Sequence, residues 1–204
     1  MAYLLGIKIE EIYIYPLGGI SKFNMDLNIS ILREFLILIM GPIFQFMAYL
    51  ILLVIMPDKT KLISIYHFGI LSFNLIPIYP LDGGRLLNLL LNRYIPYKLS
   101  LNIISIISYF IIILIFFYSN KTTNIFVMLI FLFFLVIKES KKKNYIYNKF
   151  LLERYIKNYN FKSTKIITSI NNFYRDKIHL INKNNNYYLE KEYLEKLYKN
   201  NKKS

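Results

Sequence analysis

The run FNLIPIYPLDGGR, residues 73–85, is the stretch from which the rest of the chain is interpreted. It places one carboxylate, Asp82, at the end of a strongly apolar sequence that Pro77 and Pro80 interrupt. A charge beside hydrocarbon is costly, so an ionisable residue at membrane depth is a functional candidate by default. Backbone unwound by prolines and glycines survives in a membrane only inside protein or along a cavity. A helix end with an N-cap aspartate at the membrane surface explains the same residues, and both interpretations stay open.

Composition places the chain in the membrane class. Of its 204 residues, 55% are hydrophobic and 17% are aromatic. A soluble protein is about 45–50% apolar, with its apolar residues dispersed, whereas here they form long runs. The chain has no cysteine, which excludes a disulfide framework and thiolate chemistry.

The apolar runs predict an all-α polytopic membrane protein with about four transmembrane segments. These segments are expected at Phe35–Met56, Leu62–Leu81, Asn102–Tyr118 and Ile125–Ile137. The first is long enough to cross a hydrocarbon core of about 30 Å, while the last is short and needs Thr122 and Thr123 to approach that length. The second contains both prolines and is expected to be a broken helix, in which side chains and free carbonyls converge on a site.

Small β elements are predicted on either side of these helices. Between Ile7 and Phe23, β-branched and aromatic residues surround two glycines, which predicts a short hairpin at the membrane edge with its turn at Gly18 and Gly19. Residues 163–189 alternate apolar and polar side chains around an Asn-rich turn, which predicts two strands, and a final helix is expected at Glu190–Lys199. The chain therefore divides into a membrane-embedded core, residues 1–137, and a small α+β tail, residues 138–204.

Positive charge is concentrated in the tail. Residues 1–137 hold nine Lys or Arg and six acidic residues, whereas residues 138–204 hold seventeen and six. Directly after a hydrophobic helix, this excess predicts a cytoplasmic tail of a multi-pass membrane protein. No nucleic-acid-binding motif accompanies the basic residues, so nucleic acid is not an expected partner.

Three isolated polar groups in the apolar part have simpler explanations than chemistry. Gln45 and His67 are expected to form interhelical hydrogen bonds or to pack between helices. Glu34 is expected to mark the membrane interface.

Four motifs carry a resemblance to a known family. They are NLIPIYPLDGGR at Asn74–Arg85, YPLGG at Tyr15–Gly19, Gly41-Pro42 within the first apolar run, and FLLERY at Phe150–Tyr155. In their order along the chain they resemble the site-2 protease family of intramembrane zinc metalloproteases, in its stage IV sporulation protein FB branch. The resemblance extends from about the first residue to about residue 155.

The resemblance implies roles for particular residues. The position of Asp82 is that of the third zinc ligand, which completes a His-His-Asp site with an open position for water. Asn74 and Pro77 are implied to bind substrate, as are Gly18 and Gly19 in the loop where a substrate segment pairs in extended form. The implied cofactor is Zn²⁺, and the implied partners are the bilayer, regulatory membrane proteins and a membrane-associated substrate resembling a sporulation sigma-factor precursor.

The tail resembles half of a nucleotide-sensing cystathionine-β-synthase-type (CBS-type) domain. It is too short for the usual pair of repeats, so a complete ATP site is not expected.

One family feature has no counterpart in the sequence. Two zinc ligands and the catalytic base of the family come from a His-Glu-x-x-His helix, but the chain has only His67 and His179, and neither lies in such a motif. The family places that motif just before the YPLGG loop, so we expect this sequence to lack its first two membrane helices. No catalytic residue is therefore assigned, and the 204 residues alone are expected to have no peptidase activity.

Two other functions fit parts of the sequence. A pseudoprotease would bind substrates or partners through Tyr15–Gly19 and Asn74–Asp82 without cutting them. A small transporter or channel would explain a broken helix with an embedded aspartate, but it would not explain Gly41-Pro42 or FLLERY.

Overall fold

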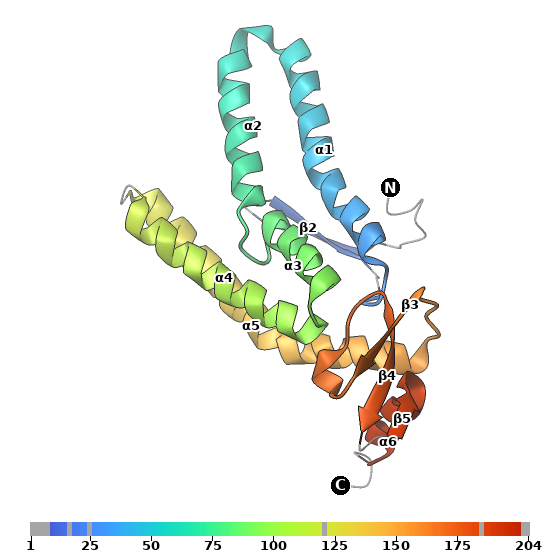
Figure 1. Cartoon of the computed structure of the whole chain (residues 1–204). Coiled ribbons are helices and arrows are strands. Elements are labelled where there is room, and N and C mark those ends of the chain that lie inside the picture. Colours follow the sequence, from blue (N-terminus) through green and yellow to red (C-terminus); the bar gives the residue numbers. More distant parts are fainter. Residues whose placement is uncertain (1–8, 16–17, 24–25, 120–121, 184–185, 201–204) are drawn as a thin grey trace.

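The computed structural model describes residues 9–15, 18–23, 26–119, 122–183 and 186–200 (Figure 1). The helices are α1 (Ile31–Ile55), α2 (Thr60–Leu75), α3 (Asp82–Tyr94), α4 (Tyr97–Tyr118), α5 (Thr123–Ile156) and α6 (Glu190–Asn200). The strands are β1 (Ile9–Tyr15), β2 (Gly18–Phe23), β3 (Ser163–Ile167), β4 (Lys177–Lys183) and β5 (Asn186–Leu189), and short 3-10 turns cover η2 (Pro57–Lys59) and η3 (Ile170–Asn172).

Three of the helices, α1, α4 and α5, are long and apolar enough to cross a membrane. They cover the first, third and fourth expected segments. The second expected segment, Leu62–Leu81, is not one helix, because α2 has 16 residues and ends at Leu75. The prolines that follow cannot donate to a helical ladder, which accounts for the early end. A count of four spanning helices is therefore not confirmed.

The last expected segment is part of a much longer helix. Helix α5 has 34 residues and continues without interruption from the apolar Thr123–Ile137 part into the basic residues that follow. Its sequence contains neither glycine nor proline, so nothing local ends the helix at the membrane boundary. The proposed division between residues 137 and 138 thus falls inside a continuous helix, and the two-domain division itself remains a prediction.

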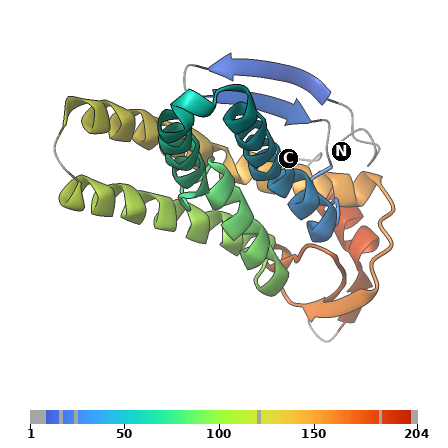
Figure 2. The same ribbon diagram turned by 90° about the horizontal axis from the view of Figure 1, so that it is seen from above.

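The helices form two pairs with α3 between them (Figure 2). Helices α1 and α2 pack as one antiparallel pair, α4 and α5 as the other, and α3 contacts α1, α2 and α4.

Two clusters of buried apolar side chains stabilise this arrangement. The loop cluster consists of Ile78, Ile112, Leu129, Leu132 and Val136. The tail cluster consists of Tyr97, Leu101, Tyr147, Phe150, Leu151, Ile167, Phe173, Ile181 and Leu194.

The expected N-terminal hairpin is present. Strands β1 and β2 pair in antiparallel fashion, with Tyr15 opposite Gly18 and Ile14 opposite Gly19. The prediction that the glycines form the turn is wrong, because this register makes both of them strand residues at the start of β2. Residues 16 and 17, which join the strands, lie outside the described residues.

The tail is α+β, as expected, but its sheet has three strands rather than two. Strand β4 pairs in parallel with β3 and antiparallel with β5, in the order β3-β4-β5. The Asn-rich stretch separates β4 from β5, while β3 is added through a crossover that contains η3. Helix α6 follows directly at Glu190, which confirms the predicted final helix.

Candidate functional site

The chain leaves helical geometry between Leu75 and Asp82. Within this loop, the backbone N–H of Ile78 donates to Ile76 O at 2.7 Å, and that of Leu81 donates to Ile78 O at 2.8 Å. The Tyr79-Pro80 peptide bond is cis. Tight local turns therefore supply hydrogen-bond partners for part of the loop's backbone. A continuous helix cannot do so here, because the two prolines have no N–H to donate.

Two glycines allow this loop to pack directly on α3. A Cβ atom on Gly83 would lie 2.1 Å from Leu75 O, and one on Gly84 would lie 2.4 Å from the carbonyl carbon of Ile78. Both neighbours are backbone atoms, which cannot move aside as the end of a flexible side chain can. The Asp-Gly-Gly sequence thus serves close backbone approach, one of the structural uses of glycine.

The loop is anchored to α4 by one side chain and one hydrogen bond. Ile78 is fully buried in the loop cluster. The N–H of Tyr79 donates to Ser108 Oγ at 2.9 Å, and that hydroxyl donates in turn to Ile104 O at 2.7 Å. Sequence reasoning missed Ser108. The available signal was the occurrence of serines at positions 105 and 108 in an otherwise apolar helix.

Asp82 is the first residue of α3, where the helix dipole favours a negative charge. Its side chain is half-buried, and Oδ2 lies 3.7 Å from the place that a Cβ of Gly41 would occupy. Gly41 of the Gly-Pro motif therefore brings α1 beside the carboxylate. Within the described ranges, the Asp82 carboxylate makes no hydrogen bond or ion pair.

The predicted substrate-binding residues fall into two groups. Asn74, in the last turn of α2, and Pro77, in the loop, lie in the same short segment as Asp82. The Asn74 amide is half-buried and, counting only residues that the structure describes, has no hydrogen-bond partner. Gly18 and Gly19 belong to β2, and Figure 2 shows the hairpin on the side of α1 and α2.

The described residues do not by themselves fit a zinc ion. Among them, no group of three or more His, Cys, Asp or Glu side chains lies close enough to hold a metal. A catalytic zinc site needs three protein ligands and an open position, and Asp82 supplies one.

Gln45 and His67 have the structural roles expected of them. Gln45 Nε2 donates to the backbone oxygen of His67 at 3.2 Å, which links the two helices. The buried His67 ring stacks on Tyr49 with centroids 4.2 Å apart. Both residues therefore hold α1 against α2, and His67 lies more than two turns before the end of α2.

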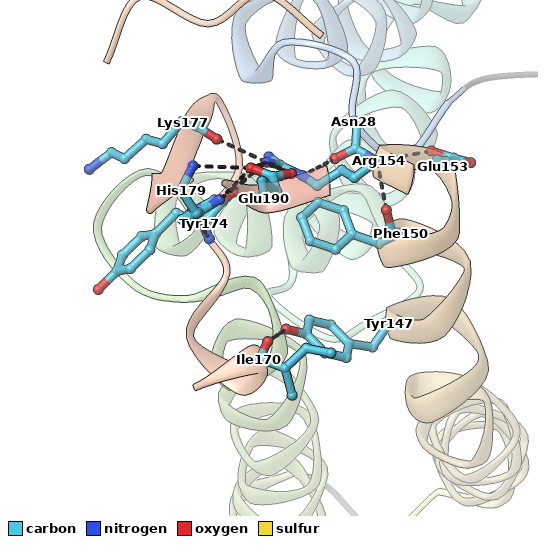
Figure 3. A network of polar contacts seen from close by, with 10 residues as sticks. All are labelled: Asn28, Tyr147, Phe150, Glu153, Arg154, Ile170, Tyr174, Lys177, His179 and Glu190. Atoms are coloured by element: carbon cyan, nitrogen blue, oxygen red, sulfur yellow. Dashed lines mark hydrogen bonds and ion pairs between the residues drawn. The ribbon is translucent and has the colours of Figure 1, made fainter. Parts of the chain in front are cut away.

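A second polar centre surrounds Arg154 of the FLLERY motif (Figure 3). The Arg154 side chain is almost completely buried and bonds to several segments that are distant in sequence. Its acceptors are Asn28 Oδ1 at 2.6 Å, Tyr174 O at 2.8 Å, Lys177 O at 2.9 Å and Glu190 Oε1 at 2.9 Å. We call Asn28, Glu153, Arg154, Tyr174, Lys177, His179 and Glu190 the Arg154 cluster.

Histidine completes this cluster in its neutral form. His179 Nε2 accepts from the backbone N–H of Tyr174 at 2.9 Å, so the proton is on Nδ1, which lies 3.1 Å from Glu190 Oε2. Burial lowers the pKa of His179. Burial alone would raise the pKa of Glu190, but the hydrogen bond from His179 and the charge of Arg154 outweigh it, so this pKa is lowered. The polar groups here satisfy one another, which indicates a structural centre.

Comparisons with known proteins support the resemblance. No family model matches the sequence. The chain is 30% identical over 165 residues to stage IV sporulation protein FB of Bacillus subtilis (strain 168), which covers 76% of the chain and 57% of that protein. It is 31% identical over 107 residues to a zinc metalloprotease of Methanocaldococcus jannaschii, which covers 48% of the chain and 31% of that protein. The chain therefore spans about half the length of the first of these relatives.

Proposed function

Because this chain is a relative of the site-2 protease family, we propose that it forms part of an intramembrane zinc metalloprotease that cleaves a membrane-associated protein. The observation that carries the proposal is the Asp82 carboxylate. It is half-buried at a break between two helices, and no described residue pairs with it. A carboxylate in such a position is available to bind a metal ion, and an ionisable residue at membrane depth is a functional candidate.

Within this proposal, one residue binds the metal and the others bind the substrate. Asp82 is a zinc ligand, and Asn74 and Pro77 line the position of the substrate backbone. Gly18 and Gly19 lie in a strand that pairs with β1 along one edge. The other edge of β2 offers backbone groups to an extended substrate segment, a common mode of peptide recognition.

The remaining zinc ligands are assigned to residues outside the present sequence. Zinc, when bound, supplies a water nucleophile at neutral pH and polarises the scissile carbonyl. The 204 residues contain no His-Glu-x-x-His, so alone they should bind no catalytic zinc and show no peptidase activity. A sporulation sigma-factor precursor is the first substrate to test. We expect it to be cleaved on the side of the bilayer where the basic tail lies. We place that side in the cytoplasm from the distribution of Lys and Arg.

The first test is the nucleotide sequence upstream of the Met1 codon. An in-frame His-Glu-x-x-His between hydrophobic runs supports the proposal, and the longer product is then the protein to assay. Stop codons in every forward frame would contradict a zinc ligand set encoded in the same gene.

The biochemical test compares two aspartates in the longer product. Asp82→Ala should abolish both bound zinc, measured by mass spectrometry of the purified protein, and cleavage of a membrane-tethered sigma-precursor reporter. Asp58→Ala changes an exposed carboxylate in the α1–α2 connection and should leave both unchanged. Full zinc content and cleavage in the Asp82 variant would contradict its assignment as a ligand.

The second candidate function is a non-catalytic pseudoprotease. It is favoured by the absence of further metal ligands beside Asp82 among the described residues. In that case the chain should retain the reporter in a pull-down through Asn74 and the hairpin, while the reporter stays intact with or without added zinc.

A further inference from the structure

The segment that leads into α1 is held by residues from the far end of the chain. This lead segment, residues 26–34, connects β2 to α1 and includes the first turn of the helix. Its polar partners lie at residues 150–176, in the last turns of α5 and in the loop before β4. The contacts form two groups, one on the Arg154 cluster and one on the following loop.

The first group fixes the start of the lead segment. Glu153 Oε2 accepts from the N–H of Leu27 at 2.7 Å, and Asn28 Nδ2 donates to Phe150 O at 3.0 Å. Arg154 donates through Nε to Asn28 Oδ1. The buried Asn28 is thus bonded on both sides of its amide, which leaves it a single position.

The second group fixes the first turn of α1. Arg175, 4% exposed, forms an ion pair of 2.6 Å with Glu34 and donates to Ile29 O at 2.7 Å. The neighbouring Asp176 accepts from the N–H of Ile31 at 2.8 Å, so it caps a helix from a position far along the chain. Asp176 has a φ of 53°, a left-handed conformation that aspartate tolerates better than most residues.

These contacts bear on both parts of the proposed site. The lead segment begins three residues after the end of β2, so its position limits where the hairpin can lie relative to α1. It also starts α1, which carries Gly41 about 15 Å further along the helix axis, beside Asp82. A shift of the first turn of α1 would therefore move Gly41 relative to the carboxylate.

We propose that residues 150–176 act as a clamp on the lead segment, and that Arg175 and Asp176 are positioning residues for the hairpin and for α1. The clamp makes the geometry of the membrane site depend on how the tail is docked. The role of the hairpin as a substrate-binding element rests on the proposed function, whereas the clamp itself does not.

Hydrogen exchange of the full chain in detergent tests the clamp without any need for peptidase activity. Glu34→Gln removes the charge on the α1 side of the ion pair and leaves every tail residue unchanged. We expect peptides covering residues 26–34 and 9–23 to exchange about tenfold faster, the loss of one charge-assisted hydrogen bond. Peptides covering residues 177–199 should be unaffected. The matched control is Glu139→Gln, which removes a carboxylate from the Glu139–Lys142 pair on the surface of α5.

Two further variants separate a clamp from general destabilisation. The charge-swapped pair Glu34→Arg with Arg175→Glu should restore part of the slow exchange in residues 9–23, because the ion pair re-forms but a glutamate at position 175 cannot donate to Ile29 O. Arg175→Glu alone should restore none of it. Unchanged exchange in residues 9–23 of the Glu34→Gln protein would overturn the proposal. A swapped pair that fails to rescue while residues 177–199 stay protected would overturn it as well. If the reporter does not bind at all, the proposed function fails, but the exchange result still stands.

Discussion

The break at Asp82 and the Arg154 cluster differ in whether their polar side chains have hydrogen-bond partners. At the break, backbone atoms and the Ser108 hydroxyl satisfy the loop, and the Asn74 and Asp82 side chains have no partner among the described residues. In the Arg154 cluster, the Glu190 carboxylate accepts from the guanidinium of Arg154 and from the imidazole of His179, and the guanidinium also donates to backbone oxygens. Asp82 and Arg154 each lie in a motif of the family resemblance.

This difference indicates which motif carries function. A polar network that satisfies itself stabilises a structure and fixes its geometry. A half-buried carboxylate that pairs with no described residue is available to a ligand such as a metal ion. The FLLERY motif therefore supplies contacts that dock the tail, whereas a ligand site at the Asp-Gly-Gly motif belongs to the proposed function.

The largest loss of stability is expected from replacing Arg154, the centre of the Arg154 cluster. Arg154→Met keeps most of the side-chain volume but leaves Glu190 and the carbonyl of Tyr174 buried without their cation. Breaking one partner of a buried ion pair costs about 3–5 kcal/mol. The free energy of unfolding, measured by denaturant titration in detergent, should fall by that amount.

The control for this variant is Lys142→Met, which removes an exposed pair with Glu139 on the same helix. Exposed pairs contribute about 0–1 kcal/mol, so its stability should hardly change. Equal stability losses in the two variants would mean that the Arg154 cluster stabilises the fold no more than a surface contact does.

A smaller loss of stability is expected from adding a side chain where the loop before Asp82 packs closely on α3. Gly84→Ala places a methyl group against the backbone of Ile78, and the loop must move away from α3. Overpacking of this kind costs about 1–3 kcal/mol. Gly69→Ala on α2 is the matched control, because nothing lies within 4 Å of its added Cβ. Alanine is the better helix former, so the Gly69 variant should be as stable as the parent or more so. A Gly84 variant as stable as the parent would contradict the close packing of loop and helix.

The hydrogen bond between the Tyr79 N–H and Ser108 should contribute less to stability than the packing of the loop on α3 does. Ser108→Ala leaves the N–H of Tyr79 without its acceptor, and an unsatisfied buried donor costs about 1–2 kcal/mol. Ser105→Ala is the matched control, since its hydroxyl donates to Leu101 O in the preceding turn and, among the described residues, contacts no other polar partner. Thermal unfolding of both proteins should separate them by several degrees, and coincident transitions would show that Ser108 does not anchor the loop.

Local sequence patterns were sufficient to predict part of this molecule. The prolines and the aspartate at residues 77–82 predicted a broken helix, and the apolar runs predicted α1, α4 and the start of α5. The β-branched and aromatic residues around Gly18 and Gly19 predicted the hairpin, and the final helix was also predicted. Each of these features depends on neighbours in the chain, which sequence periodicity reports directly.

The rest depended on contacts between distant residues. Nothing near Asn28 in the sequence indicates that it meets Arg154, and nothing near Asp176 indicates that it caps α1. The turn of the hairpin was misplaced because the register, rather than the presence of glycine, determines which residues lie in the strands. Ser108 was missed for the same reason, since its partner Tyr79 lies on another element.

The smallest predicted effect is a dependence of tail stability on pH through His179. Its pKa in the folded protein is lowered from 6.5, so the unfolded chain takes up a proton at a higher pH than the folded chain does. The contribution of neutral His179 is therefore fully present above about pH 6.5 and is lost as the pH falls below it. Glu190, whose pKa is lowered from 4.5, adds a second loss at more acidic pH. Unfolding midpoints measured between pH 5 and 8 should fall toward pH 5 in the parent protein. In His179→Gln the midpoints should be lower throughout and flatter with pH, because Gln does not titrate. Parallel curves for the two proteins would mean that the Arg154 cluster does not hold His179 in its neutral form.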